Sequence, residues 1–335
     1  MTYGHGDDIQ DFDDIRINFS SNVYNGFSHE ALFSYLSHRM GLVLNYPEPE
    51  PRRLEQRLAE WVGLEPSQVM ATCGATEAIY LVAQAFGGCH SVVVEPTFAE
   101  YADACRLFGH RVTSVRDIGE QPLDADLCWL CNPNNPTGRV VDRQRLVRHI
   151  QAHPRTLFIV DASYAPFTDL PLLSPEASAA MSNVLLLHSL TKRFSVPGLR
   201  VGYATADGEL LQRMRRCRRP WAMDSMALEA ALYLLDHADE YPIPLADLLY
   251  ERKRVAQALE GMGGIETYPS DTHILLCLLH RGTAAGLKDH LARRHGVLIR
   301  DASNFHGLTD AHFRIAVQTK AENDILISRL TDYVY

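Results

Sequence analysis

Short apolar runs alternate with helical patterns between about residues 69 and 203, and this alternation limits the possible folds more than any other feature of the chain. The runs at 127–130, 157–160 and 184–187 have the length and the character of buried strands. Strands that alternate with helices predict a parallel sheet, because a helix returns the chain to the edge at which the next strand begins. The sequence therefore predicts an α/β fold with a mostly parallel sheet.

Beyond residue 203 the chain predicts a second, smaller α+β domain. Residues 226–262 are expected to form one long helical connection. Strands are then expected near 272–278, 297–299 and 313–317, with helices near 284–295 and at the C-terminal end. The predicted division is an N-terminal arm with part of the small domain at 1–45, a large domain at 46–235, and a connecting helix with the small C-terminal domain at 236–335.

The composition suits a two-domain enzyme and argues against other classes of protein. With 335 residues, of which 46% are hydrophobic, the chain can bury a sizeable core. Its net charge of −9 argues against general nucleic-acid binding, and the arginine-rich run at 213–219 is expected on a solvated or interface face of an amphipathic helix. No apolar segment reaches the ~18 residues of a membrane span, and the N-terminus lacks a signal-peptide core. We therefore expect a cytoplasmic protein without membrane or nucleic-acid partners.

The seven cysteines are an odd number scattered among apolar runs, which indicates reduced, buried thiols rather than a disulfide framework. Cys128 and Cys131 form a C-x-x-C pair, but they lie on a predicted strand, and no second Cys/His pair has a zinc-like spacing. We therefore expect both thiols to pack in the core, and we expect no metal site.

The segment 189–202 gathers the groups that would bind a phosphorylated aldehyde. Lys192 can condense with an aldehyde as a Schiff base, and Ser189, Thr191 and Arg200 can ligate a phosphate. Because the apolar run 184–187 precedes this segment, the lysine is expected just past the carboxyl end of a strand, where open α/β sheets bind ligands. Taken alone, the segment also fits a polar surface turn.

Three upstream segments supply matching chemistry. Asn135 lies in a rigid loop of asparagines and prolines that follows a predicted strand. Asp161 ends the next strand, three residues before Tyr164, and a carboxylate there could keep a pyridine nitrogen protonated. Gly74, Ala75 and Thr76 open a helical run whose free N–H groups could bind phosphate oxygens.

In this order, these segments resemble the fold-type I pyridoxal-phosphate enzymes of the aspartate aminotransferase superfamily, over nearly the whole chain. The resemblance implies that Lys192 carries the cofactor, that Asp161 pairs with the ring nitrogen, and that Asn135 and Tyr164 bond to its phenolic oxygen. It further implies that Phe98 stacks on the cofactor ring. The implied phosphate site is made by Gly74, Ala75, Thr76, Ser189, Thr191 and Arg200. Where many relatives have Asp-Glu-Ala-Tyr, this chain has Asp161-Ala162-Ser163-Tyr164.

Members of this superfamily form homodimers with active sites at the interface. Tyr46, in Tyr46-Pro47-Glu48, resembles the tyrosine that reaches the cofactor phosphate of the partner subunit. The resemblance therefore implies a homodimer with shared sites.

Two arginines are the expected anion ligands of the substrate. Arg314 matches the C-terminal arginine of the superfamily that binds the α-carboxylate as a bidentate fork. Arg300 would add a second anion site, unless it forms a surface ion pair with Asp301. Asn22, Asn135 and His5 complete the expected substrate-binding set.

Within the superfamily the chain most resembles the threonine-phosphate decarboxylases, followed by the histidinol-phosphate aminotransferases. The likeness is carried by segments 4–9, 11–22, 96–101, 213–221 and 298–314. One departure is that Gly6-Asp7-Asp8 replaces Gly-Gly-Asn. The resemblance implies decarboxylation of L-threonine O-3-phosphate to (R)-1-amino-2-propanol O-2-phosphate for cobalamin biosynthesis, with amino transfer as the alternative.

Overall fold

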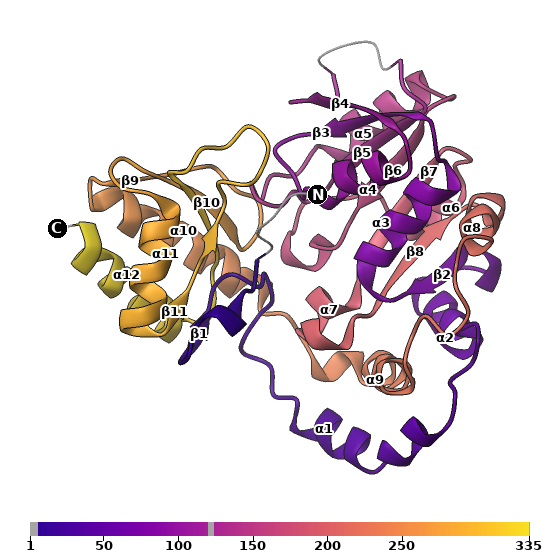
Figure 1. The fold of residues 1–335 in the computed structure, drawn as a ribbon, viewed down its shortest axis with the longest axis horizontal. Helices are drawn as coiled ribbons and strands as arrows, with labels where there is room; N and C mark the ends of the chain where they lie inside the picture. Colours follow the sequence, from indigo (N-terminus) through magenta and orange to yellow (C-terminus); the bar gives the residue numbers. More distant parts are fainter. Residues whose placement is uncertain (1–5, 120–123, 335) are drawn as a thin grey trace.

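A seven-stranded sheet forms the larger part of the structure, a computed structural model that describes residues 6–119 and 124–334 (Figure 1). The strand order is β2-β8-β7-β6-β5-β3-β4. Neighbouring strands are parallel except at β8, which runs antiparallel to β2 and β7. The strands are β2 (Val69–Thr72), β3 (His90–Val94), β4 (Arg111–Val115), β5 (Leu127–Cys131), β6 (Leu157–Asp161), β7 (Val184–Ser189) and β8 (Gly202–Ala206). The predicted α/β fold with a mostly parallel sheet is confirmed.

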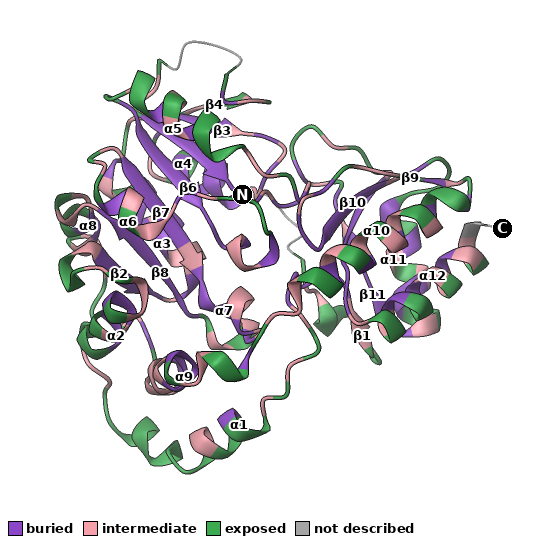
Figure 2. Ribbon diagram, turned by 180° about the vertical axis from the view of Figure 1, so that it is seen from behind, coloured by how far each residue is buried: buried purple, intermediate pink, exposed green. Residues whose placement is uncertain are grey.

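Helices cover both faces of this sheet, which explains why its central strands are apolar along their length (Figure 2). In β6, Leu157 and Ile159 share a hydrophobic cluster with α3 and α4, whereas Phe158 and Val160 share another with α5 and α6. Successive side chains of a strand point to opposite faces, so both sets are buried. These helices are α3 (Gly74–Ala85), α4 (Glu100–Leu107), α5 (Arg143–Ala152) and α6 (Pro175–Ala179).

Four of the seven cysteines are buried as expected, whereas Cys73, Cys89 and Cys217 are only partly buried. All seven are free, and Cys128 and Cys131 lie buried in β5, one in each of the two clusters. Within the described residues, no group of three or more His, Cys, Asp or Glu side chains could hold a metal ion.

A third cluster packs helices around the β2 edge of the sheet. Its helices are α2 (Arg52–Val62), α7 (Leu190–Arg193) and α9 (Ser225–Asp236), while α1 (Glu30–Ser37) adds Leu32. The arginine-rich run at 213–219 only begins in a helix, α8 (Gly208–Arg215). Arg215 and Arg218 bond to the buried Glu55 of α2, at 2.9 and 2.6 Å. Two arginines of the run are thus internal ion-pair partners rather than part of a solvated face.

The C-terminal region forms a smaller antiparallel sheet, β12-β13-β10-β9, covered by three helices (Figure 1). Its elements are α10 (Leu245–Gly261), β9 (Ile265–Thr267), β10 (Ile274–Leu279), α11 (Ala284–His295), β11 (Val297–Leu298), β12 (Arg300–Asp301), β13 (His312–Ala316) and α12 (Lys320–Val334). The N-terminal strand β1 (Ile17–Asn18) pairs in parallel with β11, so the arm joins this region. The limits of the three predicted parts stay predictions.

The helical stretch expected at 226–262 is present, but it is divided into two α-helices. Two helices, α9 and α10, occupy this stretch, and a segment with Pro242 and Pro244 separates them. A proline lacks the N–H that a helix needs and clashes with the preceding turn, so neither helix extends through the segment.

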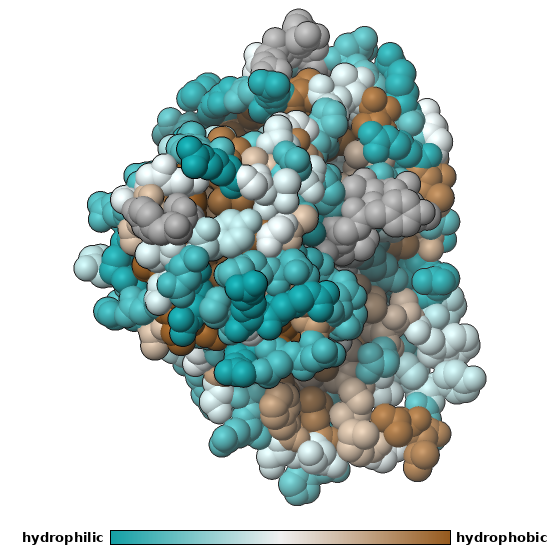
Figure 3. All heavy atoms as spheres, turned by 60° about the vertical axis from the view of Figure 1, so that its left-hand side comes forward, coloured by the Kyte–Doolittle hydropathy of each residue, from teal (hydrophilic) through white to brown (hydrophobic). Residues whose placement is uncertain are grey.

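The two sheets lie beside one another along the long axis of the molecule (Figure 1). The face turned forward in Figure 3 is mostly hydrophilic, and hydrophobic residues gather at its lower edge, at the height of α1 in Figure 1. In the part of the chain that the structure describes, no helix combines the length and the hydropathy needed to cross a membrane.

Candidate active site

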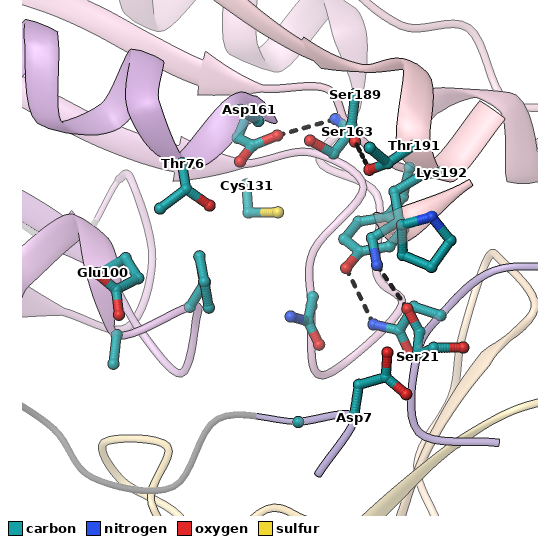
Figure 4. Close-up of a pocket in the computed structure, with 18 of the residues that line it drawn as sticks. Asp7, Ser21, Thr76, Glu100, Cys131, Asp161, Ser163, Ser189, Thr191 and Lys192 are labelled. Atoms are coloured by element: carbon teal, nitrogen blue, oxygen red, sulfur yellow. Dashed lines mark hydrogen bonds between the residues drawn. The ribbon is translucent and has the colours of Figure 1, made fainter. Parts of the chain in front are cut away.

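A cavity of about 720 Å³ lies between the carboxyl ends of the central strands and the smaller sheet. Most of the predicted site residues line it, and Figure 4 shows several of them converging from different elements. The predicted residues in its lining are Asn22, Ala75, Thr76, Phe98, Asn135, Asp161, Tyr164, Ser189, Thr191, Lys192, Arg200, Arg300 and Arg314. The structure thus brings together groups that are widely separated in the sequence.

Lys192 lies in α7, directly after β7, as predicted from the preceding apolar run. Its Nζ donates a hydrogen bond of 2.5 Å to the carbonyl oxygen of Ser21. Burial of the amine, and next the positive charge of Arg314, lower the pKa of Lys192 to about 8. A substantial neutral fraction near neutral pH makes this amine a good nucleophile for an aldehyde.

Asp161 is the last residue of β6 and is only 5% exposed. Its Oδ2 accepts a hydrogen bond of 2.7 Å from the Tyr101 hydroxyl, and its Oδ1 accepts one of 2.9 Å from the Ser163 N–H. Burial raises the pKa of Asp161, while these bonds and the charge of Lys192 act in the opposite direction. A positive partner inside the cavity would favour the ionised carboxylate further.

The opposite side of the cavity is built by Asn22, Tyr164, Asn135 and Arg314. Asn22 Nδ2 donates to the Tyr164 hydroxyl at 3.0 Å, and Arg314 Nη1 donates to Asn135 Oδ1 at 2.6 Å. Arg314 is 3% exposed, and burial lowers its pKa to about 9. Its Nε and the Asn22 Oδ1 are buried without a hydrogen-bond partner. Unsatisfied buried polar groups are costly, so a ligand that pairs with them would bind favourably.

The helix α3 begins beside Arg200, and its N-cap residue makes no side-chain capping bond. Gly74 has φ +77°, and a Cβ there would lie 2.6 Å from Arg200 Nη2. A Cβ on Gly202 would lie 2.6 Å from the Ala75 nitrogen. These glycines therefore permit a close approach of backbone, helix terminus and guanidinium, which is an arrangement suited to a phosphate.

The remaining phosphate candidates lie close by. The hydroxyls of Ser189 and Thr191 are 2.6 Å apart, and both side chains line the cavity, as Figure 4 shows. Phe98 also lines it, with its ring edge-on to that of Tyr101 at 5.9 Å between centroids.

Arg300 faces the cavity from β12 and is 7% exposed. Its Nη2 donates to Asn304 Oδ1 at 2.7 Å, and its guanidinium lies 5.5 Å from the centre of the Phe305 ring. The β12-β13 pairing places Arg300 beside Arg314, so Arg300 faces the cavity rather than the surface, while the charge of the neighbouring Asp301 also acts on it.

Two predicted residues among those that the structure describes do not line this cavity. Gly74 lies behind Arg200, and Tyr46 is 85% exposed and packs against Trp221 at 5.4 Å between ring centroids. His5 lies outside the described residues.

The model of the family "aminotransferase class I and II" matches residues 14–330. The chain belongs to this family. Among solved structures it is similar to L-threonine-O-3-phosphate decarboxylase from Porphyromonas gingivalis, at 36% identity and a TM-score of 0.92, covering 95% of this chain and 99% of that one. Histidinol-phosphate aminotransferase from Thermoanaerobacter sp. (strain X514) is 32% identical over 86% of this chain and 84% of its own.

A second solved structure supports the fold. The histidinol-phosphate aminotransferase of Sinorhizobium meliloti, solved in complex with pyridoxal-5′-phosphate, has a TM-score of 0.85 at 21% identity, covering 96% of this chain and 91% of that one. The cofactor of the chain is pyridoxal 5′-phosphate. The cavity fits this group, since it offers a lysine amine with a lowered pKa, a buried carboxylate and a glycine-lined helix terminus.

Sequence reasoning missed several residues of this aminotransferase-family site. Tyr101 and Ser163 hold Asp161, Asn304 holds Arg300, and Asp7 also lines the cavity. Tyr101 lies in the segment 96–101 that carries part of the family likeness, but nothing local in the sequence pairs it with Asp161.

Proposed function

We propose that the protein decarboxylates L-threonine O-3-phosphate to (R)-1-amino-2-propanol O-2-phosphate and CO2, as a cytoplasmic step of cobalamin biosynthesis. The observation that supports this most is that two buried arginines, Arg300 and Arg314, line the same cavity as Lys192. They suit a substrate with two anionic groups, a carboxylate and a phosphate. The similarity to the Porphyromonas gingivalis decarboxylase supports the same reaction.

In this proposal the residues around the cofactor hold it in a fixed orientation. Lys192 carries it, Asp161 bonds to its ring nitrogen, and Tyr164 bonds to its phenolic oxygen. Asn135 shares the contact with that oxygen, Phe98 stacks on the ring, and the phosphate is held by Gly74, Ala75, Thr76, Ser189, Thr191 and Arg200. The cofactor, when bound, supplies an electron sink for bonds at the substrate Cα.

The substrate residues then decide which bond at Cα breaks. Arg314 holds the α-carboxylate as a bidentate fork, Arg300 holds the phosphate, and Asn22, Asn135 and His5 contribute further contacts. The bond between Cα and the carboxylate breaks, CO2 leaves, and Cα takes up a proton. Lys192 is the donor of that proton, because its amine lies inside the same cavity.

Amino transfer is the second candidate, and the identity to histidinol-phosphate aminotransferases favours it. Lys192 would then move a proton away from Cα, and a 2-oxo acid would accept the amino group. The two reactions use the same cofactor site and differ in how the substrate is oriented.

One experiment separates them. The holoenzyme is incubated with L-threonine O-3-phosphate without an oxo acid, and in parallel with histidinol phosphate and 2-oxoglutarate. We expect CO2 and the amino-propanol phosphate from the first mixture. Glutamate from the second mixture, with no CO2 from the first, would overturn the decarboxylase proposal in favour of amino transfer.

Arg300→Ala tests the phosphate site within the same assay. Losing a buried, charge-assisted partner should lower kcat/KM for the phosphorylated substrate by about 100-fold. It should change any residual turnover of unphosphorylated threonine little, so discrimination between the two forms should fall.

We also propose a homodimer that shares its sites. Exposed apolar side chains cluster along α1, the following turn η2 (Met40–Leu44) and Tyr46. They are Phe33, Met40, Leu42, Val43, Leu44 and Tyr46, joined by Trp221. A second copy of the chain would cover this surface and bring Tyr46 to the cofactor phosphate of its partner.

A further inference from the structure

Asp7 reaches into the cavity from the N-terminal segment, at the position where the sequence departs from the decarboxylases. Its N–H donates to Ser20 Oγ at 3.1 Å, and Asn18 Nδ2 donates to its Oδ1. Figure 4 shows Asp7 on one side of Ser21 and Lys192 on the other side of Ser21. The carboxylate is therefore held in place by β1 and the residues that follow it.

Asp7 lies close to the residues that we propose as substrate ligands. A Cβ on Gly6 would lie 3.1 Å from Arg300 Cδ, so the segment passes directly over that arginine. The negative charge of Asp7 acts on Lys192 and on Arg314, where it opposes part of the lowering of both pKa values that burial causes. A substrate that extends from Arg314 past Lys192 to Arg300 would therefore run beside the Asp7 carboxylate.

Asp8 differs from Asp7 in its surroundings. It pairs with Lys288 of α11 and does not line the cavity, although its charge acts on Arg300. Of the two neighbouring carboxylates, Asp8 thus ties the segment to the smaller sheet region, and Asp7 faces the cavity.

We propose that Asp7 is a specificity-determining residue that limits the negative charge of the substrate side group. A carboxylate beside the two arginines opposes each further negative charge placed there, so it penalises a dianion more than a monoanion of the same shape. The inference rests on the proposed function, because it assumes that the side group lies between Arg300 and Arg314. According to this inference, Asp7 makes the preference of the site for dianionic phosphate weaker than the two arginines alone would make it.

The test compares two unreactive ligands with the threonine skeleton but no amino group, 3-(phosphooxy)butanoate and 3-(sulfooxy)butanoate. Near pH ~8 the phosphate ester is dianionic, because its second pKa is about 6, whereas the sulfate ester carries a single charge. Their dissociation constants are measured by calorimetry on the wild-type holoenzyme and on the Asp7→Asn holoenzyme. Asn tolerates the left-handed backbone of this residue, with φ +66°, and its amide oxygen can still accept from Asn18.

Asp7→Asn should increase the preference for phosphate over sulfate by at least about fivefold. Asp13→Asn is the matched control, because Asp13 is an exposed carboxylate of the same segment that lies outside this cavity, and it should change the ratio by less than about twofold. An unchanged ratio in Asp7→Asn, with both affinities lowered together, would mean that Asp7 only anchors the segment and would overturn the inference. An equal change in Asp13→Asn would overturn it too, since the effect would then come from the general field of the segment.

The outcome is independent of turnover. If the holoenzyme binds both ligands but releases no CO2 from threonine phosphate, the proposed reaction fails while the ratio still tests Asp7. Cofactor absorbance and the melting temperature of each variant show whether it is folded and loaded.

Discussion

The Tyr101 hydroxyl donates a hydrogen bond of 2.7 Å to Oδ2 of Asp161, which links α4 to the carboxyl end of β6. The Tyr101 ring also stacks on Trp129 of β5, at 5.8 Å between centroids, so the donor is fixed by packing on the sheet. Asp161 thus depends on a residue sixty positions earlier in the chain for its orientation.

Tyr101→Phe should lower kcat by about tenfold, because a hydrogen bond to a charged group is lost. The bond favours the ionised carboxylate, so its removal raises the pKa of Asp161 beyond the increase that burial already causes. The proposed role requires the ionised form. Activity should therefore be lost at a higher pH on the acidic side, which a pH profile of kcat would measure.

Tyr203→Phe is the control for this prediction, because Tyr203 is equally buried but stacks on His188 away from the cavity. The acidic limb of the pH profile of kcat for Tyr203→Phe should match that of the wild type. An unmoved acidic limb in Tyr101→Phe would show that Asp161 does not need this bond.

Arg314→Met should raise the pKa of Lys192, because the positive charge of Arg314 is the second cause, after burial, of its lowered value of about 8. The neutral amine attacks the aldehyde, so capture of the cofactor by the apoprotein should need a higher pH in the variant. Borohydride trapping across pH, followed by peptide mapping, measures this and should locate the adduct on Lys192.

Arg300→Met is the matched control, since Arg300 is not among the charges that shift Lys192. The pH at which half of the cofactor is captured by Arg300→Met should equal that of the wild type. An adduct on another lysine would refute the assignment of Lys192.

Gly74→Ala should weaken cofactor binding at least about tenfold, because the new Cβ would lie 2.6 Å from Arg200 Nη2 and displace the guanidinium. The left-handed backbone should also cost about 1 kcal/mol of unfolding free energy. Gly63→Ala shares the strain, with φ +70°, but its Cβ meets nothing within 4 Å. Only the first variant should lose cofactor affinity in a titration, and equal losses in both would contradict the proposed contact.

Mixing inactive Lys192→Ala subunits with impaired Tyr46→Phe subunits should restore activity. In a heterodimer, one of the two sites receives Lys192 from one chain and Tyr46 from the other, so up to about half of the wild-type activity per heterodimer is expected. Each variant incubated alone serves as the control. An active monomer in sedimentation would contradict the shared site.

Local patterns in the sequence were sufficient for the central strands, the placement of Lys192 after β7 and Asp161 at the end of β6. The continuous apolar runs demand burial on both faces of a sheet, and polar residues that follow such runs must lie at its carboxyl edge. The same reasoning did not locate the break within 226–262, where a segment with two prolines separates α9 from α10.

By itself the sequence determined the fold class, because the fold class follows from short-range periodicity. It also predicted Lys192 as the cofactor lysine, from the residue types grouped along the chain around it. Only the tertiary structure decided that Arg300 turns inward, that Tyr101 bonds to Asp161, and that Asp7 lines the cavity while Asp8 does not. These contacts join elements whose separation along the chain carries no local signal. They depend on how the two sheets and the N-terminal segment pack around one cavity.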